Sequence, residues 1–298
     1  MKLKELKKEK NFLMISSKYS SYEKSKIVIL SAPLEKTVSY GKGTSYGPKE
    51  IIKASHYVEF YDEELDRELC FEKGICTLEE LDFEKLSHKK SIELIELTVD
   101  KILKDDKFVV TLGGEHSISY APIAAYTKKY KNISILQIDA HSDLRDEYEG
   151  SKLSHASVMK RVFEINPNIV QVGIRAQCIE ESKFIKENNI NTFYARDIKT
   201  GKHGQNWIEK VVSKLSENVY ITFDIDGLDP SVVPATGTPE PGGLLWDETM
   251  DLFKLVGKTK NILGFDVVEL SYDKNSKISS FNAAKLTYKL LNYSFINK

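Results

Sequence analysis

Short apolar runs alternate with stretches of helical periodicity along most of the chain. The runs expected to form strands lie at 26–30, 108–112, 133–136, 169–174, 191–194, 219–223 and 262–268. Between them, apolar residues recur every three or four positions, as at Ile92, Ile95, Val99 and Ile102, which is the spacing of one helical face. Strands that alternate with helices predict a parallel sheet covered on both faces, so the expected fold class is α/β.

The same pattern predicts where the helices lie and how many domains there are. Helices are expected near 49–53, from 117 toward 126, and near 91–103, 178–188, 206–217, 247–257 and 281–291. No break in composition divides the chain, so we expect one domain over 1–298, with residues 1–25 as an N-terminal tail or extension. Residues 57–90 are charged and weakly periodic, which indicates a peripheral hairpin or short strands.

Composition narrows the class of protein. The net charge of −1 gives no general attraction to nucleic acid or to an anionic membrane. The Lys-rich first ten residues are interrupted by Glu5 and Glu9, so we expect a solvated tail or helix and not a nucleic-acid-binding arm. No apolar stretch approaches the roughly 18 residues needed to cross a membrane. The 3 cysteines lack CxxC spacing, which indicates reduced thiols and a cytoplasmic location.

A glycine-punctuated loop at 39–48 resembles a nucleotide-binding loop at first sight. Its glycines do not complete a GxGxxG fingerprint, because Tyr46 stands where the third glycine would be, and no GK[ST] follows. We therefore expect this loop to form part of a substrate rim or an interface.

The strongest chemical signal is the stretch 137–143, which follows an apolar run. Asp139, His141 and Asp143 alternate with small residues, and alternate side chains of an extended backbone point the same way. Carboxylates held so close together repel each other unless a cation lies between them. Asp224 and Asp226 repeat this arrangement after the run 219–223. Both strand ends are therefore expected to supply ligands to one metal centre.

Two further polar residues stand at strand ends. His116 follows Gly113-Gly114, and Glu269 follows the run 262–268. In open α/β sheets, ligands bind at the carboxyl edge of the strands. Two imidazoles and several carboxylates are too many ligands for one zinc ion, and they suit two divalent ions, Mn²⁺ before Mg²⁺ or Zn²⁺. Because a two-metal site converts a bridging water into hydroxide at neutral pH, the expected reaction is hydrolysis.

These motifs resemble those of the ureohydrolase family of arginases and agmatinases, and most closely those of agmatinases. The matching segments are 113–117, 139–143, 154–156, 223–243 and 266–269. The resemblance implies a three-layer α/β/α fold with a mostly parallel central sheet. It also implies two Mn²⁺ ions per chain, a guanidino substrate cleaved to urea and an amine, and a homo-oligomer, usually a trimer or hexamer. The implied metal ligands are His116, Asp139, His141, Asp143, Asp224 and Asp226.

The resemblance also assigns roles in catalysis. A metal-bridging hydroxide would attack the guanidinium carbon, and Asp143 would take a proton from it. Glu269 would pair with the guanidinium and position it. His155 is the candidate proton shuttle to the leaving amine, because imidazole titrates near neutral pH.

The loop 144–150 bears on the choice of substrate. It holds three carboxylates and one arginine, which should favour a cationic substrate tail over a carboxylate. Asp146 or Glu149 would then face the free amine of agmatine, and the products would be putrescine and urea. Guanidinobutyrate and arginine remain alternative substrates. A mononuclear zinc amide hydrolase of the deacetylase type remains an alternative class of enzyme.

Overall fold

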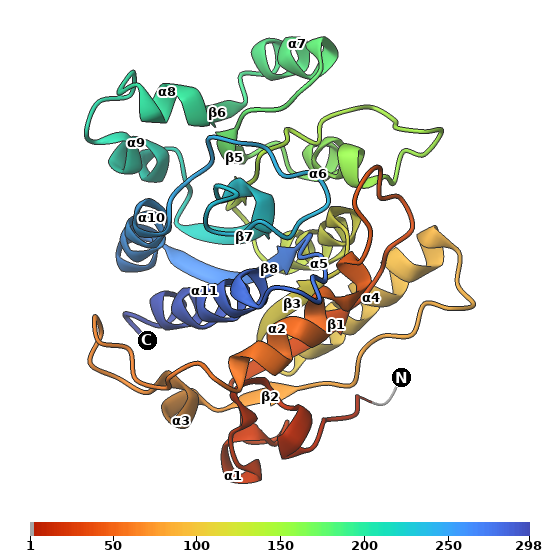
Figure 1. Ribbon diagram of the computed structural model, residues 1–298, viewed down its shortest axis with the longest axis vertical. Coiled ribbons are helices and arrows are strands. Elements are labelled where there is room, and N and C mark those ends of the chain that lie inside the picture. Colours follow the sequence, from red (N-terminus) through yellow and green to blue (C-terminus); the bar gives the residue numbers. More distant parts are fainter. Residues whose placement is uncertain (1–2) are drawn as a thin grey trace.

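A parallel sheet of eight strands forms the centre of the molecule (Figure 1). The computed structural model describes residues 3–298. The strands are β1 (Ile27–Ala32), β2 (Ile75–Thr77), β3 (Phe108–Gly113), β4 (Ile133–Ile138), β5 (Ile169–Ile174), β6 (Asn191–Tyr194), β7 (Asn218–Asp224) and β8 (Asn261–Val268). Their order in the sheet is β2-β1-β3-β8-β7-β4-β5-β6, and every neighbouring pair is parallel. The predicted α/β fold is confirmed.

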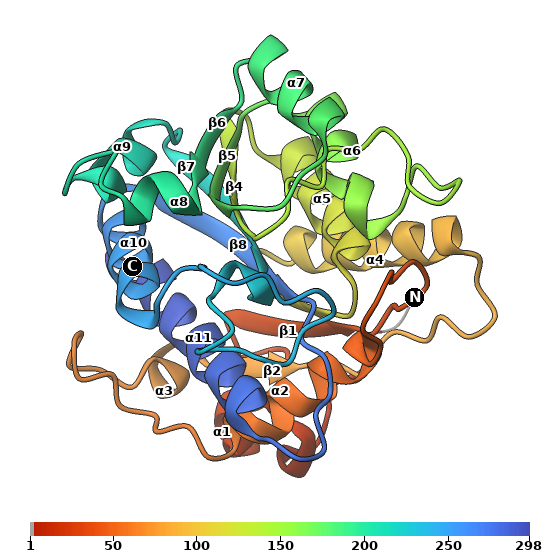
Figure 2. The ribbon, with the colours of Figure 1, turned by 45° about the horizontal axis from the view of Figure 1, so that its top comes forward.

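Helices cover both faces of the sheet, giving the three layers that the family resemblance implied. They are α1 (Ser17–Ser20), α2 (Gly47–Ser55), α3 (Leu69–Lys73), α4 (His88–Lys104), α5 (Tyr120–Lys129), α6 (Val158–Ile165), α7 (Ile179–Glu187), α8 (Ala195–Lys199), α9 (Trp207–Ser213), α10 (Trp246–Thr259) and α11 (Ile278–Ser294). Figure 2 shows α2 and α11 on one side of the sheet and α4 and α5 on the other.

Two apolar cores lie between these layers because alternate strand residues point to opposite faces. Ile27 and Ile29 of β1 pack in the core beneath α2 and α11, whereas Val28 and Leu30 pack in the core beneath α4 and α5. Burial on both faces explains why the strands are continuous apolar runs without polar alternation.

Several local predictions need correction. Of the two alternatives for residues 57–90, the structure contains a short strand, the edge strand β2, which pairs in parallel with β1, and it forms no hairpin within the sheet over this range. The short helix α3 in the same range was not predicted. No helix was expected over residues 158–165, where the structure has α6, whose Val158, Met159 and Val162 are buried. The two helices were missed because they are only five and eight residues long, too short to display a period.

The N-terminal segment is a packed extension. Residues 4–10 are mostly exposed, but Phe12, Leu13 and Ile15 are buried. The backbone N–H of Phe12 donates to Thr77 Oγ1, and that of Leu13 donates to Ser55 Oγ. The part after residue 10 is therefore a structural element and not a solvated tail. Within residues 3–298, no helix is both long and apolar enough to span a bilayer, and all three cysteines are free thiols.

Candidate metal centre and active site

The carboxyl ends of three central strands, β3, β4 and β7, carry the predicted metal ligands, and that of β8 carries Glu269. The strands β3, β8, β7 and β4 are neighbours in the sheet, although they are far apart in the sequence. Ile138 of β4 pairs with Phe223 of β7, so the residues that follow, Asp139 and Asp224, leave the sheet side by side. His116 opens a 3-10 turn, η4 (His116–Ser119), directly after β3. Strand register therefore brings distant parts of the sequence to one edge.

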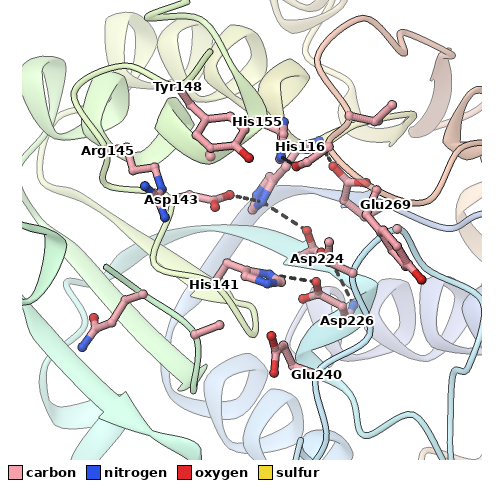
Figure 3. A pocket seen from close by; sticks show the side chains of 18 of the residues that line it. His116, His141, Asp143, Arg145, Tyr148, His155, Asp224, Asp226, Glu240 and Glu269 are labelled. Carbon is pink, nitrogen blue, oxygen red and sulfur yellow. Dashed lines mark hydrogen bonds and ion pairs between the residues drawn. The ribbon is translucent and has the colours of Figure 1, made fainter. Parts of the chain in front are cut away.

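The predicted ligands form two groups that share Asp139. His116 Nδ1 lies 3.1 Å from an oxygen of Asp139, 3.0 Å from one of Asp143 and 3.3 Å from one of Asp224. His141 Nδ1 lies 3.0 Å from Asp226 Oδ2 and 3.7 Å from Asp139 Oδ1. The ligand atoms of His116, Asp139 and Asp224 are close enough to hold one cation, and those of Asp139, His141 and Asp226 are close enough to hold another. Figure 3 shows both imidazoles turned toward the aspartates.

The tautomer of His116 suits metal binding. Its Nε2 lies 2.9 Å from Thr222 Oγ1, and that hydroxyl donates its only proton to Asp266 at 2.8 Å. Nε2 must therefore carry the ring hydrogen, and Nδ1 presents a lone pair. Nδ1 is buried, and its neighbours among the described residues are carboxylate oxygens, which accept and cannot donate to this lone pair. An outer hydroxyl and carboxylate that fix a ligating imidazole are typical of metal sites.

The carboxylates also need a cation. Burial, together with the charge of Asp139, raises the pKa of Asp143 above its usual range. Burial, together with the charges of Asp226 and Asp139, raises the pKa of Asp224. Divalent ions between these groups would favour their ionised forms. The donor set of imidazole nitrogens and carboxylate oxygens therefore fits a pair of divalent cations.

Glu269 lies beside the metal ligands. Its Oε1 accepts a hydrogen bond of 2.6 Å from the backbone N–H of His116, and burial raises the pKa of its carboxyl group. Glu269 and Asp143 both adopt positive φ, 64° and 53°. Non-glycine residues in this backbone region often mark functional sites, where the surrounding structure maintains the strain.

A cavity of about 250 Å³ opens above the ligands. Glu269, His155, Tyr148, Arg145 and Glu240 line it, and Figure 3 shows them around the two histidines. The predicted rim loop contributes residues 39–41 to its lining. The cavity therefore has metal ligands at one end and both acidic and basic groups on its walls.

The structure does not bring Asp146 and Glu149 to this cavity. Both residues are exposed, and neither is part of its lining. The Asp146 side chain, 61% exposed, pairs instead with Arg161 at 2.8 Å and Lys152 at 3.2 Å. The loop places its arginine inward and its carboxylates outward, the reverse of the expectation for a cationic substrate tail.

Glu240 is the carboxylate that sequence reasoning missed. It lies in the Pro/Gly-rich loop that follows β7 and lines the cavity. Its backbone carbonyl accepts hydrogen bonds from Arg175 at 2.7 and 3.2 Å. Arg175 also binds the carbonyl of Asp226 at 2.6 Å. The Pro/Gly-rich composition of this loop was the sequence signal that could have drawn attention to it. The inward position of Glu240, however, depends on Arg175, which is far away in the sequence.

A parallel sheet whose carboxyl edge gathers two histidines and four aspartates is typical of divalent-metal enzymes. The chain belongs to the arginase family, whose model matches residues 25–292. The N(1)-aminopropylagmatine ureohydrolase of Synechocystis sp. is 39% identical over 93% of this chain and 92% of that protein. The agmatinase of Bacillus cereus is 37% identical over 87% of this chain and 89% of that protein.

Solved structures agree with this membership. The agmatine ureohydrolase of Thermoplasma volcanium superposes with a TM-score of 0.84 at 30% identity, covering 96% of this chain and 94% of that one. The predicted resemblance to ureohydrolases is confirmed, as is the prediction that the chain is an enzyme of the hydrolase class.

Proposed function

We propose that this chain hydrolyses guanidinoalkylamines, with agmatine as the first candidate, to urea and an amine, which from agmatine is putrescine. The observation that carries the proposal is the pair of overlapping ligand groups at one end of a cavity that also contains Glu269. A relative named agmatinase and another named N(1)-aminopropylagmatine ureohydrolase support a substrate with a cationic tail.

The metal centre of this proposal is two Mn²⁺ ions per chain. The residues that would hold them are His116, Asp139, His141, Asp143, Asp224 and Asp226. When bound, two such ions supply Lewis acidity and lower the pKa of water. The unpartnered Nδ1 of His116 and the excess of buried carboxylates support this assignment.

Three side chains would handle the substrate and its protons. The Glu269 carboxylate pairs with the guanidinium group and holds its carbon toward the attacking water. Asp143 accepts a proton from that water. His155, which lines the same cavity, delivers a proton to the leaving amine.

The substrate tail would be recognised by Glu240. Neither Asp146 nor Glu149 lines the cavity, whereas the Glu240 carboxylate does, and among residues 3–298 it forms no ion pair or side-chain hydrogen bond. An ammonium group would give this carboxylate a partner. Arg145 favours the second candidate, guanidinobutyrate, because its guanidinium also lines the cavity and could pair with a carboxylate.

Urea release from a panel of guanidino compounds with Mn²⁺ tests the proposal. We expect agmatine or its N(1)-aminopropyl derivative to exceed guanidinobutyrate and arginine by at least about tenfold in kcat/KM, roughly the effect of one charge pair. Glu240→Gln should reduce this preference, whereas Glu149→Gln, an exposed change outside the cavity, should not. If guanidinobutyrate is turned over faster than agmatine, and Arg145→Gln loses this activity, guanidinobutyrate would replace agmatine as the substrate.

Metal content separates the proposed enzyme from a deacetylase-like hydrolase. We expect close to two divalent ions per chain, and a value near one zinc would favour the deacetylase type. The family resemblance also leads us to propose a homo-oligomer, a trimer or hexamer, which the molar mass in solution would test.

A further inference from the structure

We propose that Thr37 and Glu115 are positioning residues that fix the orientation and the tautomer of His155, so that Nε2 is the nitrogen that exchanges protons in the cavity. This inference rests on the proton-transfer role of His155 in the proposed function. It concerns two residues that are neither proposed metal ligands nor part of the lining of the cavity.

Glu115 is a fully buried carboxylate surrounded by donors. Its Oε2 accepts from the backbone N–H groups of Lys36 at 2.8 Å and Thr37 at 2.6 Å. Its Oε1 accepts from the hydroxyls of Thr37 at 3.0 Å and Ser117 at 2.6 Å. His88 Nε2 is farther away, at 3.6 Å. A buried carboxylate with four donors is a rigid anchor, and it ties the end of β3 to the segment after β1.

The hydroxyl of Thr37 connects this anchor to His155. Its single proton goes to Glu115, so toward any other neighbour it can only accept. It accepts from the backbone N–H of His155 at 3.0 Å, and it lies 3.3 Å from His155 Nδ1. Because the hydroxyl has no second proton to give, this contact is a hydrogen bond only when Nδ1 carries the ring hydrogen.

The opposite ring nitrogen is then free to accept. His155 Nε2 lies 2.9 Å from the hydroxyl of Ser39, a residue of the cavity rim, so Ser39 donates to it. Ser154 Oγ is the other neighbour of Nδ1, at 3.3 Å, and its lone pairs allow it to share the same ring hydrogen. Burial lowers the pKa of His155, which keeps the ring neutral when no proton is being transferred.

This tautomer matches the proton balance of the proposed reaction. A guanidinium cation and one water give urea and an alkylammonium ion: a bond forms between the water oxygen and the guanidinium carbon, and the bond between that carbon and the alkyl-bearing nitrogen breaks. Both protons of the water end on the leaving nitrogen. A neutral ring with its lone pair on Nε2 can collect a proton from the cavity and release it to that nitrogen, while Thr37 holds the ring in place.

Removal and restoration of the Thr37 hydroxyl test the proposal. Thr37→Val should lower kcat by about tenfold or more, a part of the total contribution of a general acid, with KM changed less than about twofold. Thr37→Ser, which keeps the hydroxyl, should return kcat to within about threefold of the wild type. Thr44→Val is the matched control, because Thr44 is buried in the adjacent loop and its hydroxyl has no partner among the described residues.

NMR can show directly which ring nitrogen of His155 carries the hydrogen. In protein labelled with ¹³C-histidine and loaded with Zn²⁺, the Cδ2 chemical shift of His155, assigned by its loss in His155→Gln, should report a hydrogen on Nδ1. Thr37→Val should move this shift toward the Nε2–H form, and Thr37→Ser should not. If Thr37→Val does not fold, Thr37→Ala serves the same purpose with less bulk.

The results of these experiments distinguish a failure of this inference from a failure of the proposed function on which it rests. An Nε2–H tautomer in the wild type, or an unchanged shift and kcat in Thr37→Val, would overturn the inference even if agmatine is hydrolysed. If no guanidino compound releases urea, the proposed function fails, and the chemical shift alone still decides the tautomer. S-(4-aminobutyl)isothiourea, whose thiol departs with less need of a proton, should lose less than about threefold in kcat in Thr37→Val; an equal loss would contradict the role in proton transfer.

Discussion

Two clusters of buried charge in this molecule are built in opposite ways. Lys289 of α11 is 3% exposed and pairs with Asp62 at 3.0 Å and Glu64 at 2.6 Å. Lys254 and the hydroxyl of Tyr293 complete the surroundings of Glu64, at 2.7 and 2.8 Å. In this cluster, every carboxylate has a cationic partner supplied by the chain.

At the carboxyl edge of the sheet, this balance between carboxylates and cationic side chains is missing. Asp139, Asp143, Asp224 and Asp226 are buried together, and within residues 3–298 no lysine or arginine forms an ion pair with them. Arg175, which binds the carbonyl of Asp226, donates to backbone carbonyls instead. The Lys289 cluster joins the segment 62–64 to α11 and is complete in itself, whereas the Asp139 cluster requires cations from solution. Changes in the two clusters should therefore have different consequences.

The largest effect is expected from a change in the shared ligand. Asp139→Asn removes a negative charge from both ligand groups, so urea release should fall by ~10³-fold or more, and the metal content should drop by at least one ion per chain. Atomic emission on the dialysed protein and a urea assay measure the two effects. Retention of both ions and of activity would show that the ligand assignment is wrong.

A change in the balanced cluster should affect stability and not metal binding. Lys289→Met leaves Asp62 without a cationic partner and should lower the free energy of unfolding by about 3 kcal/mol. Urea denaturation monitored by circular dichroism measures this loss, with metal content as the second readout. Lys285→Met, on the same helix but only partly buried and with no ion pair to any of residues 3–298, should cost less than about 0.5 kcal/mol. Equal losses in both variants would contradict the role of the cluster.

The outer hydroxyl of the metal centre should have a smaller effect. Thr222→Val deprives the Nε2–H of His116 of its acceptor and frees the ring to change its tautomer. Metal affinity should fall by about tenfold, while unfolding of the metal-free protein should change little. Competition with a chelator gives the affinity, with Thr44→Val as the control. An unchanged affinity would mean that Thr222 does not orient the imidazole.

The smallest effect is a pH dependence of the balanced cluster. Burial alone would raise the pKa of Glu64, but hydrogen bonds from Lys254, Lys289 and Tyr293 lower it to about 2. A carboxyl with a depressed pKa contributes stability above its unfolded value of about 4.5, and this contribution is lost as the pH falls toward 2. In metal-free protein, Glu64→Gln should cost about 1 kcal/mol at pH 6 and less than half of that at pH 3. A constant difference across this range would refute the assignment.

Much of the central sheet and of the metal centre could be predicted from short stretches of the sequence. Apolar runs that end in a ligand-type residue identified β3, β4, β7 and β8, because burial on both faces requires continuous apolar sequence. The same argument could not locate β2 within residues 57–90 or find α3, since neither is long enough to show a period. It also could not find Glu240 or Thr37, because each depends on a contact with a residue distant in the chain.

The loop 144–150 after β4 shows most clearly what could not be predicted from the sequence. Its composition favoured acidic side chains facing the substrate, but Arg161 of α6 pairs with Asp146 and holds it at the surface, while Arg145 lines the cavity. A count of charges in a loop does not determine which of them point inward.

The sequence by itself determined the secondary structure of the central strands, the identity of the ligand-type residues and their location at strand ends, because these follow from side-chain periodicity within a few residues. Tertiary structure decided which strands are neighbours, and therefore that His116, Asp139 and Asp224 converge. It also decided that Thr37 meets Glu115 and His155, contacts that span 78 and 118 residues of chain. Such contacts are set by the packing of whole layers, whose energy is shared among the many apolar residues of both cores and is not encoded in any one segment.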